Sequence, residues 1–157
     1  MTIAKKLRRY IPAAEEFAYD EFPFYWLARV QGVYQQQMER VLKKIGTDIP
    51  TWRVLFILKV HGRLGVSEIA DHAIVKLSTM TRMVQRMRDE GLVETAPHPD
   101  DARVTEVVVT PAGQALTAAI EDATSRLFAH SFDGMTEPQI ARLNEALRQL
   151  HDNLASL

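Results

Sequence analysis

The sequence predicts a mainly α-helical fold with one small β-hairpin, and three observations support this. Apolar residues recur every three or four positions along most of the 157-residue chain, which is the period of an amphipathic helix. The period changes to two only in LVETA (92–96) and VTEVVV (104–109), as in paired strands with one buried face. Helix-start and helix-stop residues divide the remainder into separate helices. The predicted order of elements is therefore α-α-α-α-β-β-α-α.

The first two predicted helices are separated by Gly46. Pro23 opens the first, and its apolar face is formed by residues at positions 27, 30, 34, 38, 41 and 45. Proline is favoured in a first helical turn because its missing N–H would have no partner there. The second helix lies within TDIPTWRVLFILKVHG (47–62), with Pro50 near its start and Gly62 at its end. It is apolar on nearly every side, so we expect it to be central and buried.

Two further helices precede the predicted hairpin. The short segment VSEIADHA (66–73) follows Gly65, and a connection of three or four residues leads to STMTRMVQRMRDE (78–90). Ser78 is the predicted N-cap of this longer helix, because a serine hydroxyl can accept a hydrogen bond from a free backbone N–H. Gly91 is its predicted left-handed stop.

Two helices are predicted after the hairpin. Thr110 and Pro111 form a start signal, and Asp133-Gly134 interrupts the helix that follows. Thr136 and Gln139 have the spacing of a capping box for the last helix. Its apolar residues fall at positions 140, 143, 147, 150, 154 and 157. This spacing indicates a hydrophobic seam, which could pair with a second chain or with the preceding helix.

The composition limits the classes of protein to consider. A hydrophobic content of 46% suits one globular domain, or a domain with a helical appendage. The absence of cysteine excludes disulfides and thiolate metal sites. The longest apolar run near the middle, VLFIL (54–58), is far too short to span a bilayer, and the N-terminus lacks a signal-peptide core. We therefore expect a soluble cytoplasmic protein with no membrane partner. The net charge of −1 neither favours nor opposes nucleic acid.

A short helix, a tight turn, a second helix and a hairpin together predict a winged helix-turn-helix. The second helix of such a motif lies in the major groove of DNA. Met80, Met83, Val84 and Met87 are expected to pack inward, and Asp89 is expected to point away from the duplex. Its predicted DNA-contacting residues are Ser78, Thr79, Thr81, Arg82, Gln85 and Arg86. Hydroxyl, amide and guanidinium groups suit base edges and phosphates, but the sequence leaves open which arginine reads a base.

The hairpin tip PHPDDARVTE (97–106) contains more charge than a turn requires. Pro97, Pro99 and Asp100 shape the turn. Arg103 could enter a minor groove beside the second helix, where narrow A·T-rich segments attract guanidinium groups. Asp101 would repel phosphate if it faced the duplex.

Residues 49–113 resemble the core of MarR-family transcriptional regulators. The resemblance rests on VSEIA, STMTRMVQRMRDEGLV, the D-x-R element Asp101-Ala102-Arg103, and VVVTPAG. The last segment has Val109 where the family pattern L-T-x-x-G has leucine. The flanking helices match in number and length, whereas residues 1–22 lie outside the resemblance. The D-x-R pattern implies that Asp101 pairs with Arg103 or with an arginine of the second helix, and so braces that side chain.

The resemblance also implies a homodimer that binds double-stranded DNA and is released by a small effector. Dimerisation would use residues 1–46 and 111–157, and the DNA-binding domain would span residues 47–110. The effector implied is an aromatic or phenolic acid, or its thioester, bound between the dimerisation helices and the winged domain. The candidate contacts are Trp26, Arg29, Tyr34, Trp52 and Arg53. The aromatic residues among them could instead belong to the core or to the dimer interface.

Other classes of function have less support. No enzyme is expected, because the sequence has no glycine-rich phosphate loop, no H-E-x-x-H motif and no nucleophile elbow. No cofactor is predicted. A metal-responsive regulator stays an alternative, although the histidines show no ligand spacing; they are His61, His72, His98, His130 and His151. A winged-helix protein–protein interaction module without DNA affinity is the other alternative.

Overall fold

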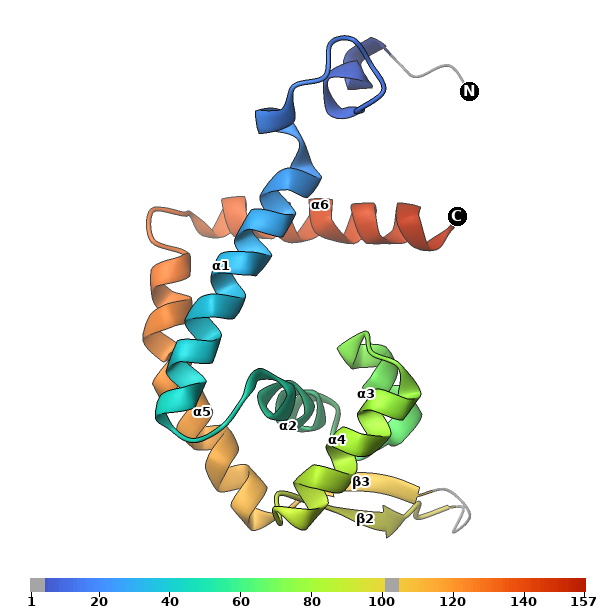
Figure 1. Ribbon diagram of the computed structural model, residues 1–157, viewed down its shortest axis with the longest axis vertical. Coiled ribbons are helices and arrows are strands. Elements are labelled where there is room, and N and C mark those ends of the chain that lie inside the picture. The colour runs from blue at the N-terminus through green and yellow to red at the C-terminus, as the bar shows by residue number, and fades with distance from the viewer. Residues whose placement is uncertain (1–4, 101–104) are drawn as a thin grey trace. The chain divides into compact units, whose positions relative to one another are not determined.

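The computed structural model describes residues 5–100 and 105–157 (Figure 1). Its elements, in chain order, are η1 (Lys5–Tyr10), η2 (Tyr19–Glu21), α1 (Pro23–Lys44), α2 (Ile49–His61), β1 (Leu64–Gly65), α3 (Val66–Ala73), α4 (Leu77–Asp89), β2 (Val93–Pro97), β3 (Thr105–Val109), α5 (Pro111–Ser131) and α6 (Glu137–Ala155). The chain forms two compact units, residues 1–124 and 125–157, with the boundary inside α5. The predicted wing residues Asp101 and Arg103 lie outside the described residues.

The predicted helices and hairpin are present, so the mainly helical fold with a wing is confirmed. Pro23 occupies the first turn of α1, as expected. The α2 helix begins after Asp48, whose Oδ1 accepts a hydrogen bond of 2.8 Å from the backbone N–H of Thr51. This carboxylate satisfies one of the N–H groups that a helix start leaves without a partner.

The core of the first unit is built around α2. Val54, Leu55 and Leu58 are almost fully buried, as the apolar character of this helix predicts. The other elements contribute inward-facing side chains, namely Met38, Leu42, Ile69, Met80, Met87, Val93, Val107 and Ile120. This strongly apolar helix therefore supports both α1 and the helix-turn-helix.

The helix-turn-helix differs from prediction at the start of α4. The N-cap is Lys76, with φ −64° and ψ 143°, and the predicted cap Ser78 is already the second helical residue. The Lys76 carbonyl accepts the N–H groups of Thr79 and Met80. The prediction was wrong because Ile74 adopts a left-handed conformation, φ 56°, that closes α3 abruptly. The next helix can then begin two residues earlier than the serine suggests.

The wing contains one more strand than predicted. Within the described residues the sheet has the order β1-β3-β2, and β1 pairs with β3 through Leu64 opposite Val107. The expected antiparallel pair is present, with Val93 opposite Val109. The prediction of a two-stranded ribbon was wrong because β1 has only two residues, too few to show an alternating pattern.

The end of α4 is joined closely to the start of α5. Gly91 ends α4 with φ 73°, a conformation that side chains with a Cβ disfavour. The Thr110 hydroxyl donates to the Gly91 carbonyl over 2.6 Å and accepts the N–H of Gly113 over 3.1 Å. A Cβ on Gly113 would lie 2.1 Å from the carbonyl oxygen of Leu92, so this position requires glycine. The Thr110 cap is confirmed.

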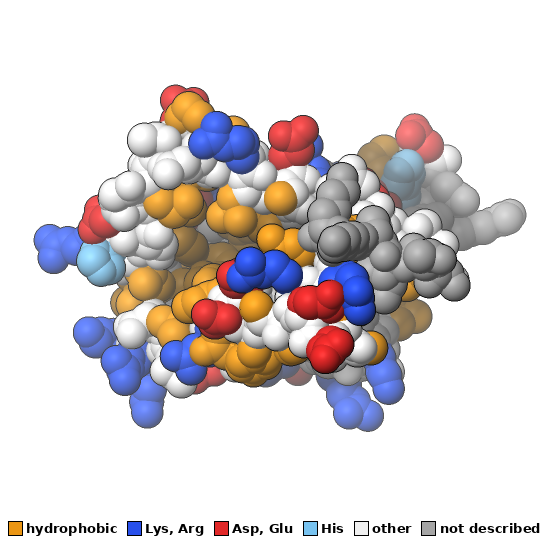
Figure 2. Space-filling model, turned by 90° about the horizontal axis from the view of Figure 1, so that it is seen from above, with side chains coloured by type: hydrophobic (Ala, Val, Ile, Leu, Met, Phe, Trp, Pro, Cys, Tyr) orange, Lys and Arg blue, Asp and Glu red, His pale blue; other side chains and the backbone are white. Residues whose placement is uncertain are grey.

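The second unit contains the end of α5 and all of α6. The break at Asp133-Gly134 is confirmed, with Gly134 at φ 78°. The side-chain oxygen of Gln139 accepts the backbone N–H of Thr136 over 2.8 Å, as the capping box predicts. None of the residues of α6 is buried. Figure 2 colours the surface side chains by type, with hydrophobic ones in orange beside charged ones in blue and red. The described residues include no helix that is both long and apolar enough to cross a membrane.

Candidate nucleic-acid interface

The α4 helix separates an inward apolar face from an exposed polar one. Met80, Val84 and Met87 are buried, and Met83 is partly buried, as predicted. All the α4 residues predicted to contact DNA are exposed, namely Ser78, Thr79, Thr81, Arg82, Gln85 and Arg86. The helix therefore presents hydroxyl, amide and guanidinium groups on a single face.

The polar side chains of that face differ in their partners. The Thr81 hydroxyl donates to the Leu77 carbonyl over 2.9 Å, and Gln85 Nε2 donates to Asp89 Oδ1 over 2.9 Å. Arg82 makes no side-chain hydrogen bond or ion pair with any residue in the described part of the chain. Its guanidinium can therefore meet a new partner without breaking a bond seen here.

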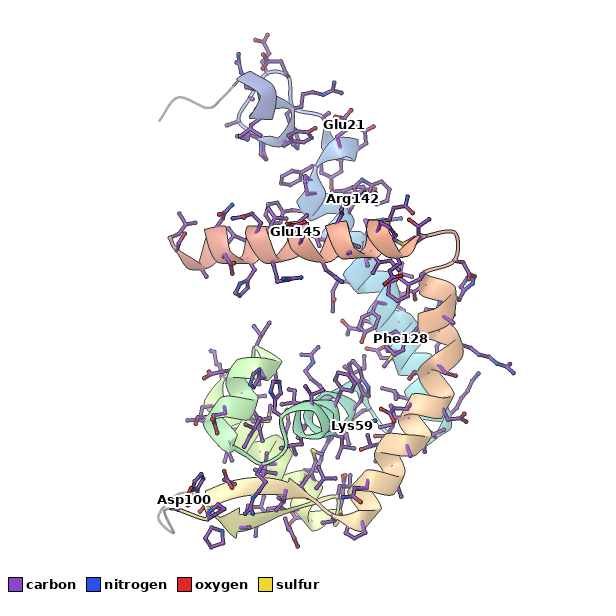
Figure 3. The ribbon with its side chains drawn as sticks, turned by 180° about the vertical axis from the view of Figure 1, so that it is seen from behind. Glu21, Lys59, Asp100, Phe128, Arg142 and Glu145 are labelled. Atoms are coloured by element: carbon purple, nitrogen blue, oxygen red, sulfur yellow. The ribbon has the colours of Figure 1, made fainter. Side chains whose placement is uncertain are left out.

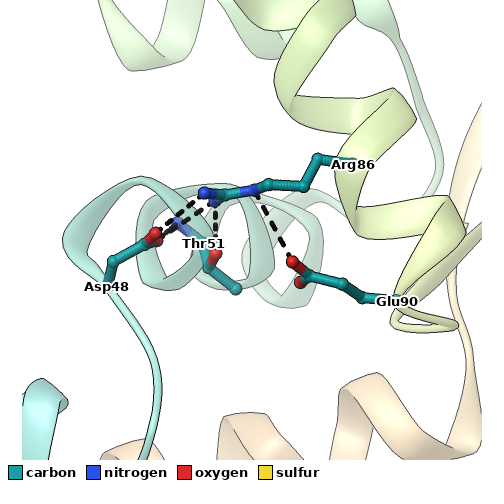
Figure 4. A network of polar contacts seen from close by, with 4 residues as sticks. All are labelled: Asp48, Thr51, Arg86 and Glu90. Carbon is teal, nitrogen blue, oxygen red and sulfur yellow. Dashed lines mark hydrogen bonds and ion pairs between the residues drawn. The ribbon is translucent and has the colours of Figure 1, made fainter.

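Arg86 is held by the start of α2 (Figure 4). Its Nη1 donates to Asp48 Oδ2 over 2.9 Å and its Nη2 donates to Asp48 Oδ1 over 3.3 Å. The same Nη2 lies 2.9 Å from the Oγ1 of Thr51, which is buried. On the other side, Nε is 3.8 Å from Glu90 Oε1. This paired geometry directs the Arg86 guanidinium toward α2.

The Asp48 carboxylate is stabilised in its charged form. Partial burial by itself would raise its pKa. The opposing contributions come from hydrogen bonds with the N–H and hydroxyl of Thr51, and from the hydrogen bond and positive charge of Arg86. Together they hold the pKa of Asp48 below its ordinary value. Asp48 is therefore an anion at neutral pH.

The described part of the wing is held by Arg63, which precedes β1. Its Nη2 donates to the Pro97 carbonyl at the end of β2 over 3.1 Å, and its Nε is 3.0 Å from Glu106 Oε2 in β3. His98 Nε2 lies 3.7 Å from the other oxygen of Glu106. Asp100, labelled in Figure 3, donates its N–H to His98 Nδ1. One arginine therefore links both long strands of the wing.

A cavity of about 440 Å³ borders the helix-turn-helix. Its walls come from α1, from the first two turns of α2, from the end of α3 and the turn that follows it, and from α4. The lining residues are Gln31, Tyr34, Gln35, Glu39, Ile49, Pro50, Arg53, Ala73, Val75, Thr79 and Met83. Its polar groups are a phenol, a guanidinium, a carboxylate, two amides and a hydroxyl, set among apolar side chains. A cavity with a few polar groups in an apolar wall is typical of a small-molecule site.

The structure brings together some of the predicted effector contacts and not others. Tyr34 and Arg53 line this cavity, and Trp52 packs edge-on against Tyr34 with ring centroids 6.4 Å apart. Trp26 is 53% exposed, and its indole donates to the Asp20 carbonyl. Arg29 lies 6.0 Å from the centroid of the Tyr25 ring and lines a different cavity with aromatic residues of η2 and α1.

Tyr34 stays protonated at neutral pH. Burial raises the pKa of its phenol, and the positive charge of Arg53 lowers it by a smaller amount. The hydroxyl can therefore act as a hydrogen-bond donor within the cavity. Arg53 donates from Nη1 to the Ala73 carbonyl over 3.2 Å, which orients its guanidinium from α2 toward the end of α3.

The histidines form one close pair. His61 and His72 stack with ring centroids 4.2 Å apart. Among the described residues, no group of three or more histidine, cysteine, aspartate or glutamate side chains could hold a metal ion.

Sequence reasoning missed Asp48, Thr51, Arg63 and Glu106. A signal existed for Asp48, because an aspartate followed at the second position by Pro50 marks a helix start. Glu106 interrupts a run of β-branched residues in β3, and such a charge in a strand with one buried face suggests a partner. Nothing local to Arg63 identifies that partner, because the two residues are 43 positions apart in the sequence.

Residues 48–105 match the MarR family. Over 146 residues the chain is 52% identical to the HTH-type transcriptional repressor IacR of Pseudomonas putida, covering 93% of this chain and 87% of the relative.

Solved structures share the fold of this chain. Rhodococcus jostii CouR bound to p-coumaroyl-CoA has a TM-score of 0.78 at 18% identity, covering 85% of this chain and 94% of that one. A mutant of Escherichia coli MarR complexed with operator DNA has a TM-score of 0.65 at 23% identity, covering 81% and 94%. The extent and identity of the match to IacR, together with the helix-turn-helix and wing described above, establish that the chain belongs to the MarR family of transcriptional regulators.

Proposed function

We propose that this protein is a repressor that binds a pseudo-palindromic operator as a homodimer and is released by a small aromatic acid or its thioester. One observation carries the proposal. The α4 helix has Arg82 and Gln85 on its exposed face, while Thr79 and Met83 of the same helix line the cavity. A ligand in the cavity would therefore contact the element that reads DNA.

DNA recognition would use the exposed face of α4 together with the wing. Arg82 and Gln85 have the groups that pair with base edges in the major groove. Ser78, Thr79 and Thr81, in the first turns of α4, would contact phosphates or nearby bases. Asp101 and Arg103 stay proposed wing contacts, with Asp101 as the brace of an arginine. The two copies of α4 in a dimer would bind half-sites whose centres are about 10 base pairs apart.

Effector binding would use the cavity beside α4. Arg53 would pair with a carboxylate or a thioester carbonyl, and the neutral phenol of Tyr34 would donate a further hydrogen bond. Support for this ligand class comes from the aromatic thioester named for CouR. A ligand between α1, α2 and α4 would shift α4 on its support. A coupling of about 1–3 kcal/mol is enough to release DNA.

Homodimerisation would use the helices of residues 1–46 and 111–157. Leu143 and Leu154 of α6 are 45% and 54% exposed in the single chain, so the predicted seam has apolar surface to offer a second copy. A regulator of this kind would act in the cytoplasm, where its DNA lies, and it would need neither a cofactor nor a membrane.

The experiment starts from selection of a binding sequence out of a random DNA pool by the wild-type protein. We expect a pseudo-palindrome, affinity that falls steeply with salt because phosphates are neutralised, and weaker binding by the Arg82→Ala variant at unchanged thermal stability. Arg40→Ala, which removes an exposed charge from α1, is the matched control and should bind like wild type. If no sequence is enriched, the interaction-module alternative is preferred.

Effector release is tested on the same operator. 6-Hydroxynicotinic acid and p-coumaroyl-CoA serve as probes, because two solved structures with this fold are described with these compounds. We expect at least one aromatic acid of a wider panel to raise the melting temperature and to weaken operator binding. A panel in which every compound that binds leaves DNA affinity unchanged would remove the effector part of the proposal.

A further inference from the structure

Arg82 and Arg86, two of the exposed arginines of α4, have different environments, and this difference assigns them different roles. They are four residues apart and therefore share a helix face. Arg82 has no side-chain partner among the described residues, whereas Arg86 makes two hydrogen bonds to Asp48 and one to Thr51. Sequence alone could not separate the two arginines.

The partners of Arg86 are themselves fixed in place. Asp48 Oδ1 already accepts the N–H of Thr51 at the start of α2, so the carboxylate cannot follow Arg86 without uncapping that helix. Thr51 is only 3% exposed, and its hydroxyl has a defined position. A bidentate arginine–carboxylate pair restricts both distance and orientation. The contact therefore sets where α4 lies relative to α2.

This contact also borders the cavity. Ile49 and Pro50, which follow Asp48 directly, line the cavity from α2, and Met83 lines it from α4 one turn before Arg86. The Asp48–Arg86 pair thus bridges the two helices at one edge of the proposed effector site.

We infer that Arg86 is a positioning residue, held by Asp48 and Thr51, and that Arg82 is the arginine of α4 that determines operator specificity. Arg86 acts on DNA through the placement of α4 and not through contact with a base. This inference rests on the proposed function, since it requires that the protein binds an operator.

The first test compares base discrimination. Wild type, Arg82→Ala and Arg86→Ala are titrated against the selected operator and against each single-base variant of one half-site. Arg82→Ala should lose discrimination at one base pair by roughly 10- to 100-fold. Arg86→Ala should bind every sequence more weakly, by roughly tenfold, with a discrimination pattern like that of wild type. Loss of discrimination at a specific base pair in Arg86→Ala would overturn the inference.

The second test uses the sign of a charge effect. Asp48→Asn keeps a side chain that caps helices well but removes the charge that holds Arg86. Under the inference, this variant binds the operator more weakly. If Asp48 instead restrains an arginine that contacts DNA, Asp48→Asn would bind more tightly, and the slope of log affinity against log salt would steepen by about one. That result would also overturn the inference.

Two further variants separate positioning through the paired contact from an effect of charge alone. Arg86→Lys keeps the charge and loses the paired geometry, so it should behave like Arg86→Ala. The double variant Asp48→Asn with Arg86→Ala should bind no more weakly than Arg86→Ala alone, because both changes remove one contact. Wild-type-like binding by Arg86→Lys, or fully additive losses, would contradict the inference. Failure of wild type to enrich any sequence would instead count against the proposed function, so the two failures are distinct.

Discussion

Arg63 and Glu106 form an ion pair within the wing, with Nε and Oε2 3.0 Å apart. The Glu106 side chain is 10% exposed, whereas that of Arg63 is 42% exposed. Oε2 is close to the guanidinium, but no hydrogen bond to it is aligned. The carboxylate therefore depends on the charge of Arg63 for compensation. His98 Nε2 lies 3.7 Å from its other oxygen.

Removing Arg63 should destabilise the wing. Arg63→Ala leaves a nearly buried carboxylate without its main counter-charge. We expect the free energy of unfolding to fall by about 1–2 kcal/mol, less than for a fully buried pair because Arg63 is half exposed. Urea denaturation near neutral pH measures this. In a Glu106→Leu background, Arg63→Ala should lower the free energy of unfolding by less than half as much. An equal loss in both backgrounds would show that the ion pair does not cause the destabilisation.

Acid should weaken the contact between α2 and α4 through Asp48. Its folded-state pKa lies below the ordinary value of 3.8. The stability that it contributes is therefore fully present well above pH 3.8 and is lost as the pH falls through the folded-state pKa. Asp48→Asn should be less stable than wild type near neutral pH, and this difference should shrink below pH 3.8. Denaturation midpoints across this range check the prediction, and a difference that does not change with pH would contradict it.

The left-handed turn at Ile74 should limit stability. A β-branched residue at φ 56° is strained, and the side chain is 91% exposed, so little burial compensates. Ile74→Asn should raise the free energy of unfolding by about 1 kcal/mol, since asparagine tolerates this conformation better. The melting temperature should rise by roughly 2–4 °C. Leu77→Asn, at an exposed position with helical backbone, is the control and should bring no such gain.

Effector binding should depend on Arg53 and not on Arg29. Both were predicted contacts, but only Arg53 lines the cavity beside α4. For the aromatic acid that binds tightest in the thermal-shift panel, Arg53→Gln should weaken binding by roughly 10- to 100-fold, because a charge-assisted hydrogen bond contributes about 1.5–3 kcal/mol. Arg29→Gln should change little. Isothermal titration calorimetry measures both, and the reverse order of effects would place the effector in the cavity of Arg29.

The seam of α6 should control association. Substituting Leu143 and Leu154 with glutamate puts charges into apolar surface that a dimer would bury. We expect the double variant to sediment as a monomer at concentrations where wild type is a dimer, with unchanged helix content. Asn144→Glu, an exposed polar position on the same helix, should sediment like wild type. If the leucine variants also remain dimeric, α6 is not the interface.

Much of the fold was predictable because its determinants are local. The apolar period, the glycines at 62, 91 and 134, and the proline at 111 mark helix bounds within a few residues. The errors have a different origin. The β1 strand exists only because β3 lies beside it, and the start of α4 depends on the left-handed Ile74, a conformation that isoleucine alone would not suggest.

The candidate site was predictable in its exposed parts only. The outward residues of α4 follow from the helical period. The distinction between Arg82 and Arg86 does not, because it is made by Asp48, which lies 38 residues before Arg86 in the sequence. Likewise, the sequence gives no reason to prefer one aromatic residue of α1 over another as an effector contact. Only the packing of α1 against α2 shows that Tyr34 lines the cavity and Trp26 does not.

The missing side chain at Gly113 has a mechanical consequence. The α5 backbone at Gly113 lies against Leu92, and Thr110 bonds to Gly91. The first turn of α5 is therefore held directly against the residues that end α4. If α5 rotated about its own axis, these contacts would pass the movement to the end of α4. Gly113 thus lets α4 and α5 be joined closely. Any larger residue at this position would push the α5 backbone away from Leu92 and change the angle between the two helices.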